Sequence, residues 1–348
     1  MKKVTVIGMD LGDKNHKAIG LSESGGEVER AEVPCTPEGV RAYLERHPGA
    51  LLAIETGTHC RWVAGVAEEL GHEVLVGNAR KLRVIWQTSR KDDWRDAEML
   101  ARIARTDRRL FHPVKLRNAG GQRLMRLVKS RDVLVRNRTA IVNQVRGFCK
   151  SEGAPLPRCS AEAFANLKEL LPPEVMDVAC HLFEVLQGLN DKIKRYDKII
   201  AKALKRLRGG DAALLDSIAG VGPVTAAAFL AAVGDPATFG SAREAGPYFG
   251  LVPRRDQSGA TDKQLRISKE GNQVVRRLLV TAANYIMGPF GKDCDLRRHG
   301  MRIAERGGKN ARKRAKVAVA RKLAVVMLAI LRNRTACRPL AEDAGPVA

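Results

Sequence analysis

Four acidic residues near the N-terminus have the types and positions expected of a metal site. Asp10 and Glu55 each directly follow a short apolar run. Acids at the carboxyl ends of strands lie at the edge where an α/β sheet carries its active site. Asp93 and Asp96 are three residues apart, so on a helix both carboxylates point the same way. Clustered carboxylates repel each other, and this set therefore predicts a hard divalent cation, Mg²⁺ with Mn²⁺ as a substitute.

A serine in the C-terminal third is a candidate nucleophile. Ser258 precedes a glycine and follows Arg254 and Arg255. Nearby cations would stabilise both a serine alkoxide and the phosphorane formed when it attacks a phosphodiester. Ser268 and Lys269 offer a similar combination further on. Because a Ser-Gly step is also typical of turns, these residues alone leave a nucleophile and a plain loop both open.

Residues 218–226 have the pattern of a helix-hairpin-helix turn, with Gly220 and Gly222 on either side of a valine. Glycines permit a tight turn whose backbone N–H groups can meet a DNA phosphate. Such contacts position DNA without selecting its sequence. A plain turn between two helices is the alternative.

The segment that carries the four acids has the pattern of an α/β domain over residues 1–112. Short β-rich runs alternate with segments of helical periodicity, which favours βαβ crossovers. The expected strands are Val4–Met9, Lys17–Leu21, Leu51–Ile54 and Val74–Val76, and the expected helices are Gly39–Arg46 and Trp62–Leu70.

Residues 113–208 predict a helical middle region with coiled-coil spacing. Apolar residues recur every seven positions, and residues 115–150 contain ten Lys or Arg and one acid. We expect a seam with a cationic face opposite, formed by two antiparallel helices or by an intersubunit coiled coil. The seam residues expected in the second helix are Val178, Leu182, Val185, Leu189, Ile193, Tyr196, Ile200 and Leu204.

Gly209-Gly210 predicts the next boundary. A mostly helical domain is expected over residues 209–335, with twelve Lys or Arg and three acids between residues 292 and 322, followed by a tail over 336–348.

The charge of the chain indicates a polyanionic partner. Its 348 residues include 61 Lys and Arg against 38 Asp and Glu, a formal net charge of +23. DNA is the expected partner. The seven scattered cysteines argue against a disulfide framework and a structural zinc, and favour the reducing cytoplasm. No apolar run is long enough to span a membrane.

The order of these motifs resembles the DEDD transposases of the insertion-sequence IS110 family. The resemblance extends from Val4 to about Leu331 and rests on the four acids, the glycine turn, and Ser258 with the following Ser-Lys-x-Gly-Asn motif. It implies an RNase H-like, or RuvC-like, N-terminal domain whose metal-binding acids are Asp10, Glu55, Asp93 and Asp96. It also implies that Ser258 joins covalently to DNA.

The resemblance further implies partners for this chain. Members of the family are guided by a structured noncoding bridge RNA that pairs with donor and target DNA. They act as tetramers in which each active site combines the acids of one subunit with the serine of another. One departure concerns Asp92, an additional carboxylate, but only Asp93 keeps the two-residue gap to Asp96.

We therefore expect a prokaryotic transposase that cuts and rejoins DNA through a serine-phosphate link with the help of Mg²⁺, and that associates with the nucleoid when bound to DNA. Two alternatives remain open from the residues. A metal-dependent junction nuclease would use the acids without the serine, and a noncatalytic nucleic-acid-binding protein would use only the basic helices.

Overall fold

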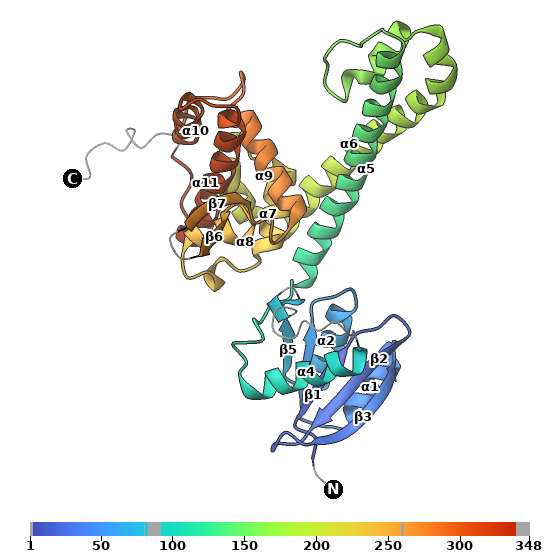
Figure 1. Cartoon of the computed structure of the whole chain (residues 1–348), viewed down its shortest axis with the longest axis vertical. Coiled ribbons are helices and arrows are strands. Elements are labelled where there is room, and N and C mark those ends of the chain that lie inside the picture. The colour runs from blue at the N-terminus through green and yellow to red at the C-terminus, as the bar shows by residue number, and fades with distance from the viewer. Residues whose placement is uncertain (1–2, 80, 83–91, 259–260, 339–348) are drawn as a thin grey trace, which may run out of the picture. The chain divides into compact units, whose positions relative to one another are not determined.

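The computed structural model describes residues 3–79, 81–82, 92–258 and 261–338, with the side chains of 258 and 261–264 left out. The chain divides into two compact units, Met1–Leu116 and Arg117–Ala348. Figure 1 shows the elements of both units along the chain. Each unit is described by itself below.

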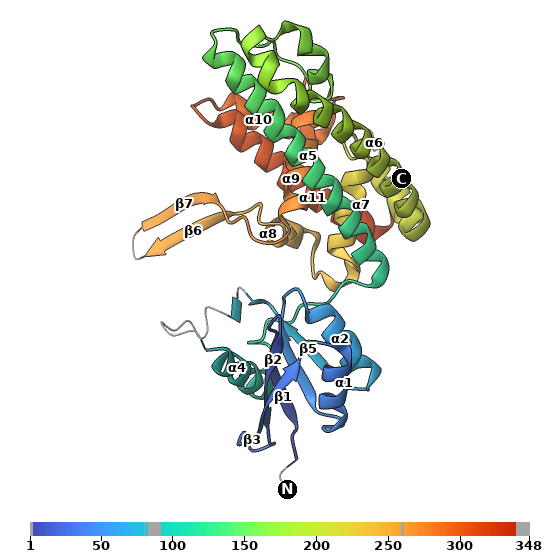
Figure 2. The same cartoon turned by 90° about the vertical axis from the view of Figure 1, so that its right-hand side faces the viewer.

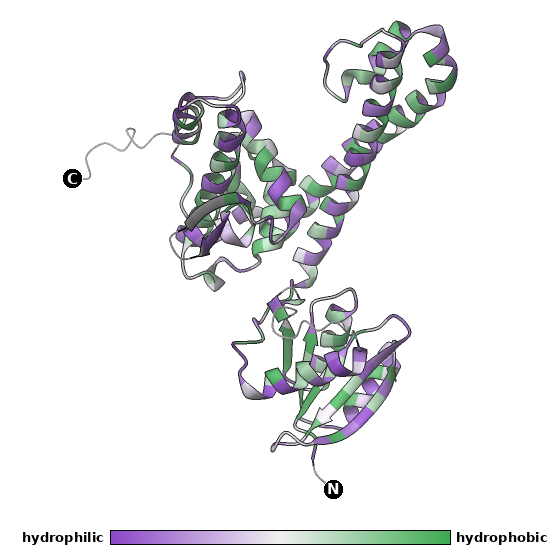
Figure 3. Ribbon diagram, in the orientation of Figure 1, coloured by the Kyte–Doolittle hydropathy of each residue, from purple (hydrophilic) through white to green (hydrophobic). Residues whose placement is uncertain are grey.

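The first unit is built on a five-stranded sheet. Its strands are β1 (Val6–Asp10), β2 (Asn15–Leu21), β3 (Glu27–Pro34), β4 (Leu51–Glu55) and β5 (Val74–Gly77), in the spatial order β3-β2-β1-β4-β5. β1, β4 and β5 are parallel, and β2 runs antiparallel to both of its neighbours. The four expected strands are present, and β3 is an addition. β3 lacks the apolar pattern by which a strand is predicted: Figure 3 shows that it is mostly hydrophilic, whereas β5 is apolar.

Helices cover both faces of this sheet. Figure 2 shows α1 (Pro37–Glu45) and α2 (Cys60–Glu69) on one side and α4 (Asp93–Thr106) on the other. Alternate residues of β1 enter the two resulting cores: Ile7 packs in the cluster with α1 and α2, and Val6 in the cluster with α4. This is the pleat of a strand buried on both faces. The expected α/β class of the N-terminal domain is confirmed.

The second unit begins with a long antiparallel helix pair, α5 (Ala119–Ser151) and α6 (Pro173–Asp216), with the 3₁₀ helix η1 (Ala163–Leu170) between them. Near the base of the pair, Leu124 and Val128 share a core with Ile200 and Leu204. Near its tip, Val142 and Val145 share a second core with Phe183. The sequence left open an antiparallel pair within one chain and a coiled coil between subunits. The seam described here joins α5 and α6 of the same chain.

The position of two valines in this seam differs from expectation. Val178 and Val185 are 61% and 49% exposed, because the buried stripe of α6 passes through Val175, Ala179 and Phe183 instead. Phe183 stacks on Phe164 of η1, and this contact fixes the rotation of the helix.

An arginine also enters the seam. Arg138 is 8% exposed and donates a hydrogen bond of 2.8 Å to Oδ1 of Asn190, so not every cation of α5 lies on the outer face.

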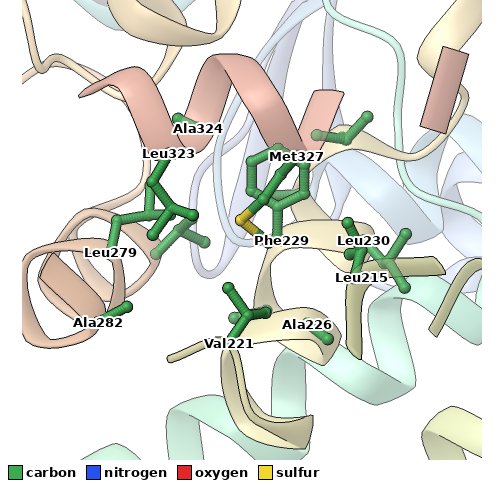
Figure 4. Close-up of a cluster of buried hydrophobic side chains, with 14 of the residues drawn as sticks. Leu215, Val221, Ala226, Phe229, Leu230, Leu279, Ala282, Leu323, Ala324 and Met327 are labelled. Carbon is green, nitrogen blue, oxygen red and sulfur yellow. The ribbon is translucent and has the colours of Figure 1, made fainter. Parts of the chain in front are cut away.

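The remainder of the second unit is mostly helical, as expected. Its helices are α7 (Pro223–Val233), α8 (Ala245–Tyr248), α9 (Gln273–Ile286), α10 (Asp295–Glu305) and α11 (Ala311–Asn333), with the 3₁₀ turns η2 (Pro236–Thr238) and η3 (Ala242–Glu244). Figure 4 shows their shared core, in which Phe229, Leu279 and Met327 meet from three helices. The expected break at Gly209-Gly210 is a kink at Arg208, after which α6 continues to Asp216.

The segment around Ser258 is a β-hairpin, where a loop was expected. β6 (Pro253–Ser258) pairs antiparallel with β7 (Thr261–Ile267). Figure 2 shows this hairpin extending away from the helices of its own unit. Because such a ribbon buries neither face, its sequence lacks the apolar alternation by which strands are recognised.

Three smaller features complete the fold. The backbone N–H of Cys337 donates to Oγ of Ser217 at 2.9 Å, so the start of the expected tail is held, while residues 339–348 lie outside the described residues. All seven cysteines are described and none forms a disulfide. Within the described residues, no helix combines the length and the hydropathy needed to cross a membrane.

Candidate active site

Two neighbouring strands place Asp10 and Glu55 side by side. β1 and β4 are parallel with Met9 opposite Ile54, so the next residue of each strand is an acid. Asp10 continues the alternation of Val6, and Glu55 that of Leu51 and Ala53, all of which belong to the face covered by α4. Both carboxylates therefore belong to the same face and the same edge of the sheet.

The first turn of α4 lies at that edge. At the opposite end of the helix, Arg105 donates to the carbonyl of Glu23, which follows the strand antiparallel to β1. The start of α4 therefore lies near the end of β1. Asp93 and Asp96 are one turn before the buried Ala97 and Leu100, so they extend the stripe by which α4 faces the sheet.

Gly8 allows α4 to approach this closely. A Cβ atom at this position would lie 2.0 Å from the carbonyl oxygen of Ala97 and 2.4 Å from the backbone nitrogen of Ala101. No side chain can occupy that space, so the strand and the helix meet backbone to backbone. The separation between Asp10 and the acids of α4 is therefore set by a glycine two residues before Asp10.

The four positions thus share one face and one edge, but they do not form a preformed metal cage. In the described ranges of the chain, no three side chains of Asp, Glu, His or Cys are grouped closely enough to hold an ion. The donor set consists of carboxylate oxygens, the ligands that Mg²⁺ and Mn²⁺ prefer. These residues fit such an ion by their chemistry.

Asp92 has a separate structural role. It is the N-cap of α4, and its Oδ1 accepts a hydrogen bond of 3.1 Å from the backbone N–H of Trp94. Aspartate is among the favoured residues at this position because it satisfies an N–H left without a partner at the start of the helix. This role distinguishes Asp92 from the two acids that follow it within the helix.

Trp94 and two cations fasten the start of α4 to the sheet, a contact that no local sequence pattern indicates. Nζ of Lys17 lies 4.8 Å from the centroid of the Trp94 ring, and the guanidinium carbon of Arg30 lies 5.3 Å from it. Lys17 is the cross-strand partner of Asp10. Lys17 lies in β2 and Arg30 in β3, so their approach to one ring follows only from the pairing of these two strands.

His59 links the loops that follow the two acid-bearing strands. Its Nε2 lies 3.0 Å from Oδ1 of Asp13, in the loop after β1, and its Nδ1 lies 3.1 Å from Nε1 of Trp62 in α2. An indole N–H can only donate, so Nδ1 of His59 accepts and Nε2 carries the proton that goes to Asp13. His59 thus ties the loop after Asp10 to the loop after Glu55.

Burial of the neighbouring His16 adds to the apolar character beneath these loops. His16 is fully buried, with its ring centroid 5.7 Å from that of Trp62 and 6.0 Å from that of His59. Burial lowers the pKa of His16, and the nearby His59 lowers it further, although the carbonyl of Gly12 opposes the shift. His16 is therefore held neutral.

The serine belongs to the other unit of the chain. Ser258 is the last residue of β6 and pairs with Thr261, but its side chain and the following Gly259 lie outside the described residues. Arg254 and Arg255 are exposed on the same strand, with an irregularity in the pairing between Pro253 and Arg255.

The exposed Lys269 follows β7. Its φ angle of 57° is in the left-handed region, and its N–H donates to the carbonyl of Gly250 at 3.1 Å. This hydrogen bond connects the end of β7 to the residues just before β6.

The glycine turn connects α6 to α7. Gly220 has a φ angle of 88°, and a Cβ there would lie 3.1 Å from the ring of Tyr285 and from the side chain of Ile286. Gly222 is the N-cap of α7, and Pro223 opens the helix. The turn is therefore tight and packs on the last turn of α9.

Comparison with known families assigns the chain. A model described as the IS116/IS110/IS902 transposase family matches residues 212–293, and a DEDD transposase model of the IS110 type matches residues 7–151. A transposase of insertion sequence IS1328 from Yersinia enterocolitica is 31% identical over 82% of this chain and 85% of that protein. The chain belongs to the IS110 family of transposases.

Other relatives align with this transposase over nearly its whole length. A probable family 20 transposase from Pseudomonas aeruginosa is 28% identical over 96% of the chain and 98% of that protein. The transposase of insertion sequence IS1111A from Coxiella burnetii is 27% identical over 97% of the chain and 92% of that protein. Membership makes the protein an enzyme of DNA strand transfer, for which a strongly basic chain is suited.

Proposed function

We propose that this transposase cuts and rejoins DNA with Mg²⁺ held by Asp10, Glu55, Asp93 and Asp96. The observation that carries the proposal is the arrangement of β1, β4 and α4, which gives all four acids one face and one edge of the sheet. The strand order β3-β2-β1-β4-β5, with β2 antiparallel, supports an RNase H-like domain.

A bound Mg²⁺ would supply charge to polarise the scissile phosphate. The chain's own contribution is to hold the carboxylates in place. Gly8 sets the distance between β1 and α4, Trp94 fastens the first turn of α4, and His59 links the loops that follow the two acid-bearing strands. Because these supports are backbone contacts, ring contacts and hydrogen bonds, they do not depend on the ion.

Ser258 acts as the nucleophile in this proposal. Its oxygen attacks the phosphorus and gives up its proton, while the bond from phosphorus to one bridging oxygen breaks and the released sugar hydroxyl takes a proton. The resulting phosphoserine retains the energy of the phosphodiester. Attack by a hydroxyl of the new strand restores the serine, so no external energy source is needed. Arg254 and Arg255 would hold the phosphate.

The remaining basic surface would hold nucleic acid. Gly220 and Gly222 would contact phosphates as a helix-hairpin-helix turn, with Lys269 as a further contact. The division of the acids and the serine between two units is compatible with a tetramer in which one subunit completes the site of another. A noncoding bridge RNA would select donor and target DNA in the cytoplasm, and the net charge of +23 leaves capacity for both polyanions.

The experiment combines single substitutions with detection of covalent products. Donor DNA carrying the element's own ends, target DNA, the bridge RNA and Mg²⁺ are incubated with wild-type, Asp10→Asn, Glu55→Gln, Asp93→Asn, Asp96→Asn or Ser258→Ala protein, and products are separated under denaturing conditions. We expect each acid variant to lose cleavage, and Ser258→Ala to lose the protein-DNA adduct while still binding DNA. Free cut ends without an adduct, unaffected by Ser258→Ala, would show a metal-dependent nuclease instead.

A further inference from the structure

The turn between α9 and α10 presents an aromatic side chain to solvent. Phe290 is 82% exposed, the highest value among the large hydrophobic side chains in the part of the chain that the structure describes; the next is Val178 at 61%. Burial of a phenylalanine is worth about 1.5–3 kcal/mol. A side chain this exposed therefore offers binding energy to a partner.

The turn that carries Phe290 is rigid. The N–H of Gly291 donates to the carbonyl of Gly288 at 3.2 Å, which makes residues 288–291 a β-turn with Pro289 at the position where proline is favoured. Nη1 of Arg297 donates to the carbonyls of Ile286 and Gly288 at 2.7 and 2.6 Å. A Cβ on Gly291 would lie 2.1 Å from the carbonyl oxygen of Ile286, so the chain is closely packed there.

A rigid turn lowers the cost of using Phe290 in binding, because little conformational entropy remains to be lost. Its surroundings indicate the kind of partner. The next exposed residue after Phe290 is Lys292, α9 contains no acid, and residues 292–322 carry twelve Lys or Arg against three acids. Asp293 is paired with Arg298 at 2.8 Å, and this contact holds the pKa of Asp293 below its usual range. Lysine and other charged residues are depleted at the centre of protein–protein interfaces, so this cationic surrounding favours a nucleic acid over a protein partner.

The glycine turn lies beside the same end of α9. Gly220 packs against Tyr285 and Ile286, the last two residues of the helix from which the Phe290 turn continues. Tyr285 is itself 50% exposed. A phosphate contact at the glycine turn and a second aromatic ring are therefore available next to Phe290.

We propose that Phe290 is a DNA-melting wedge that stacks on an unpaired or unstacked base. Apolar side chains inserted at a base step unstack it, and stacking on an aromatic ring stabilises a base that has left the helix. Strand transfer requires unpaired strands, so such a contact would serve the transposase. The inference rests on DNA binding by the chain and not on the roles of Ser258 or the four acids.

The test uses the full-length protein in EDTA, with two probes. One is a short duplex of arbitrary sequence, and the other is the same duplex with a central mismatched bubble that contains 2-aminopurine. Affinity is measured by fluorescence anisotropy and stacking by quenching of 2-aminopurine. The variants are Phe290→Ala and Phe290→Trp, with Val178→Ala as the matched control for loss of an exposed apolar side chain.

We expect Phe290→Ala to weaken binding to the bubble about tenfold, because one stacked base is lost. The 2-aminopurine quenching that Phe290 causes should disappear. Phe290→Trp should retain both, and the paired duplex should be affected much less. The proposal is overturned if Phe290→Ala binds the bubble like wild type. It is also overturned if the substitution changes only the oligomeric state seen by light scattering, which would identify a protein contact.

Strand transfer, measured separately in Mg²⁺ with donor DNA that carries the element's ends, separates this inference from the proposed chemistry. Asp10→Asn and Ser258→Ala should lose strand transfer and keep wild-type affinity for the bubble. If those variants transfer strands normally while Phe290→Ala loses bubble binding, the proposed chemistry fails and the wedge stands.

Discussion

Replacement of Gly8 by alanine tests whether the contact between β1 and α4 sets the geometry of the acids. The new Cβ would lie 2.0 Å from the carbonyl oxygen of Ala97, and a normal carbon-oxygen contact is at least about 3.3 Å. Relief of the clash therefore moves α4 outward by about 1.3 Å. Overpacking of this kind typically costs 1–3 kcal/mol, and because backbone lies on both sides we expect about 3 kcal/mol.

The expected displacement is large enough to affect chemistry. Misplacement by about 1 Å can reduce a catalytic rate about a hundredfold, so Gly8→Ala should lower transposition by at least that factor. For a unit of this size, a loss of about 3 kcal/mol lowers the melting temperature by roughly 10 °C. Transposition frequency is measured in cells and normalised to protein abundance, and thermal unfolding is measured on the purified protein.

Gly65→Ala is the matched control, because it makes the same substitution in the same unit. Gly65 lies in α2, and a Cβ there would have no atom within 4 Å. Alanine is favoured over glycine in a helix by about 1 kcal/mol, so this variant should be as stable as wild type or more so, with normal transposition. If Gly8→Ala behaves like Gly65→Ala, the close approach of β1 and α4 does not position the acids.

Three further predictions concern single side chains. Asp92→Ala removes the N-cap of α4, so it should lower the free energy of unfolding by about 1 kcal/mol but retain transposition. Asp93→Asn should abolish transposition. Equal loss of activity in both variants would contradict the separate roles. Arg138→Ala should destabilise the α5–α6 pair by about 2 kcal/mol in urea unfolding, because it leaves Oδ1 of Asn190 without this donor. The double variant Arg138→Met with Asn190→Leu, which removes both partners, should be close to neutral. Folding lowers the pKa of His16, so the unfolded chain binds a proton more readily than the folded chain. The free energy of unfolding should therefore fall as the pH falls through about 6.5. His16→Phe should flatten this dependence in melting temperatures measured across that pH range.

The acid-bearing strands could be predicted from the sequence because burial on both faces leaves a clear pattern. Val6–Asp10 and Leu51–Glu55 are apolar runs that end in acids, so both the strands and their edge followed directly. β3 could not be found in this way, since Glu27, Glu29, Arg30 and Glu32 make an edge strand look like a loop. Arg30 lies in β3, so its contact with Trp94 could not be predicted, whereas Lys17 lies in an expected strand and its contact depends on how α4 packs on the sheet.

Long-range contacts explain the other differences. Heptad spacing predicted the α5–α6 pair but placed Val178 and Val185 in the seam, because the rotation of α6 depends on Phe164, which is far from both valines in sequence. The described side chains of the β6–β7 hairpin are mostly exposed, with Ile267 at its base packed against the core, so neither strand carries an apolar face that is visible in the sequence. In both cases the deciding interaction lies outside the local pattern.

The α5–α6 pair closes on itself at its base, where Leu124 meets Ile200 and Leu204. The exposed residues 158–160 at the other end, which precede η1 and Phe164, can therefore be lengthened without moving the two points where the pair joins the rest of its unit. This apex is a permissive insertion site for an affinity tag or a fluorescent reporter. It is also where we expect chain length to vary most among natural copies of the element.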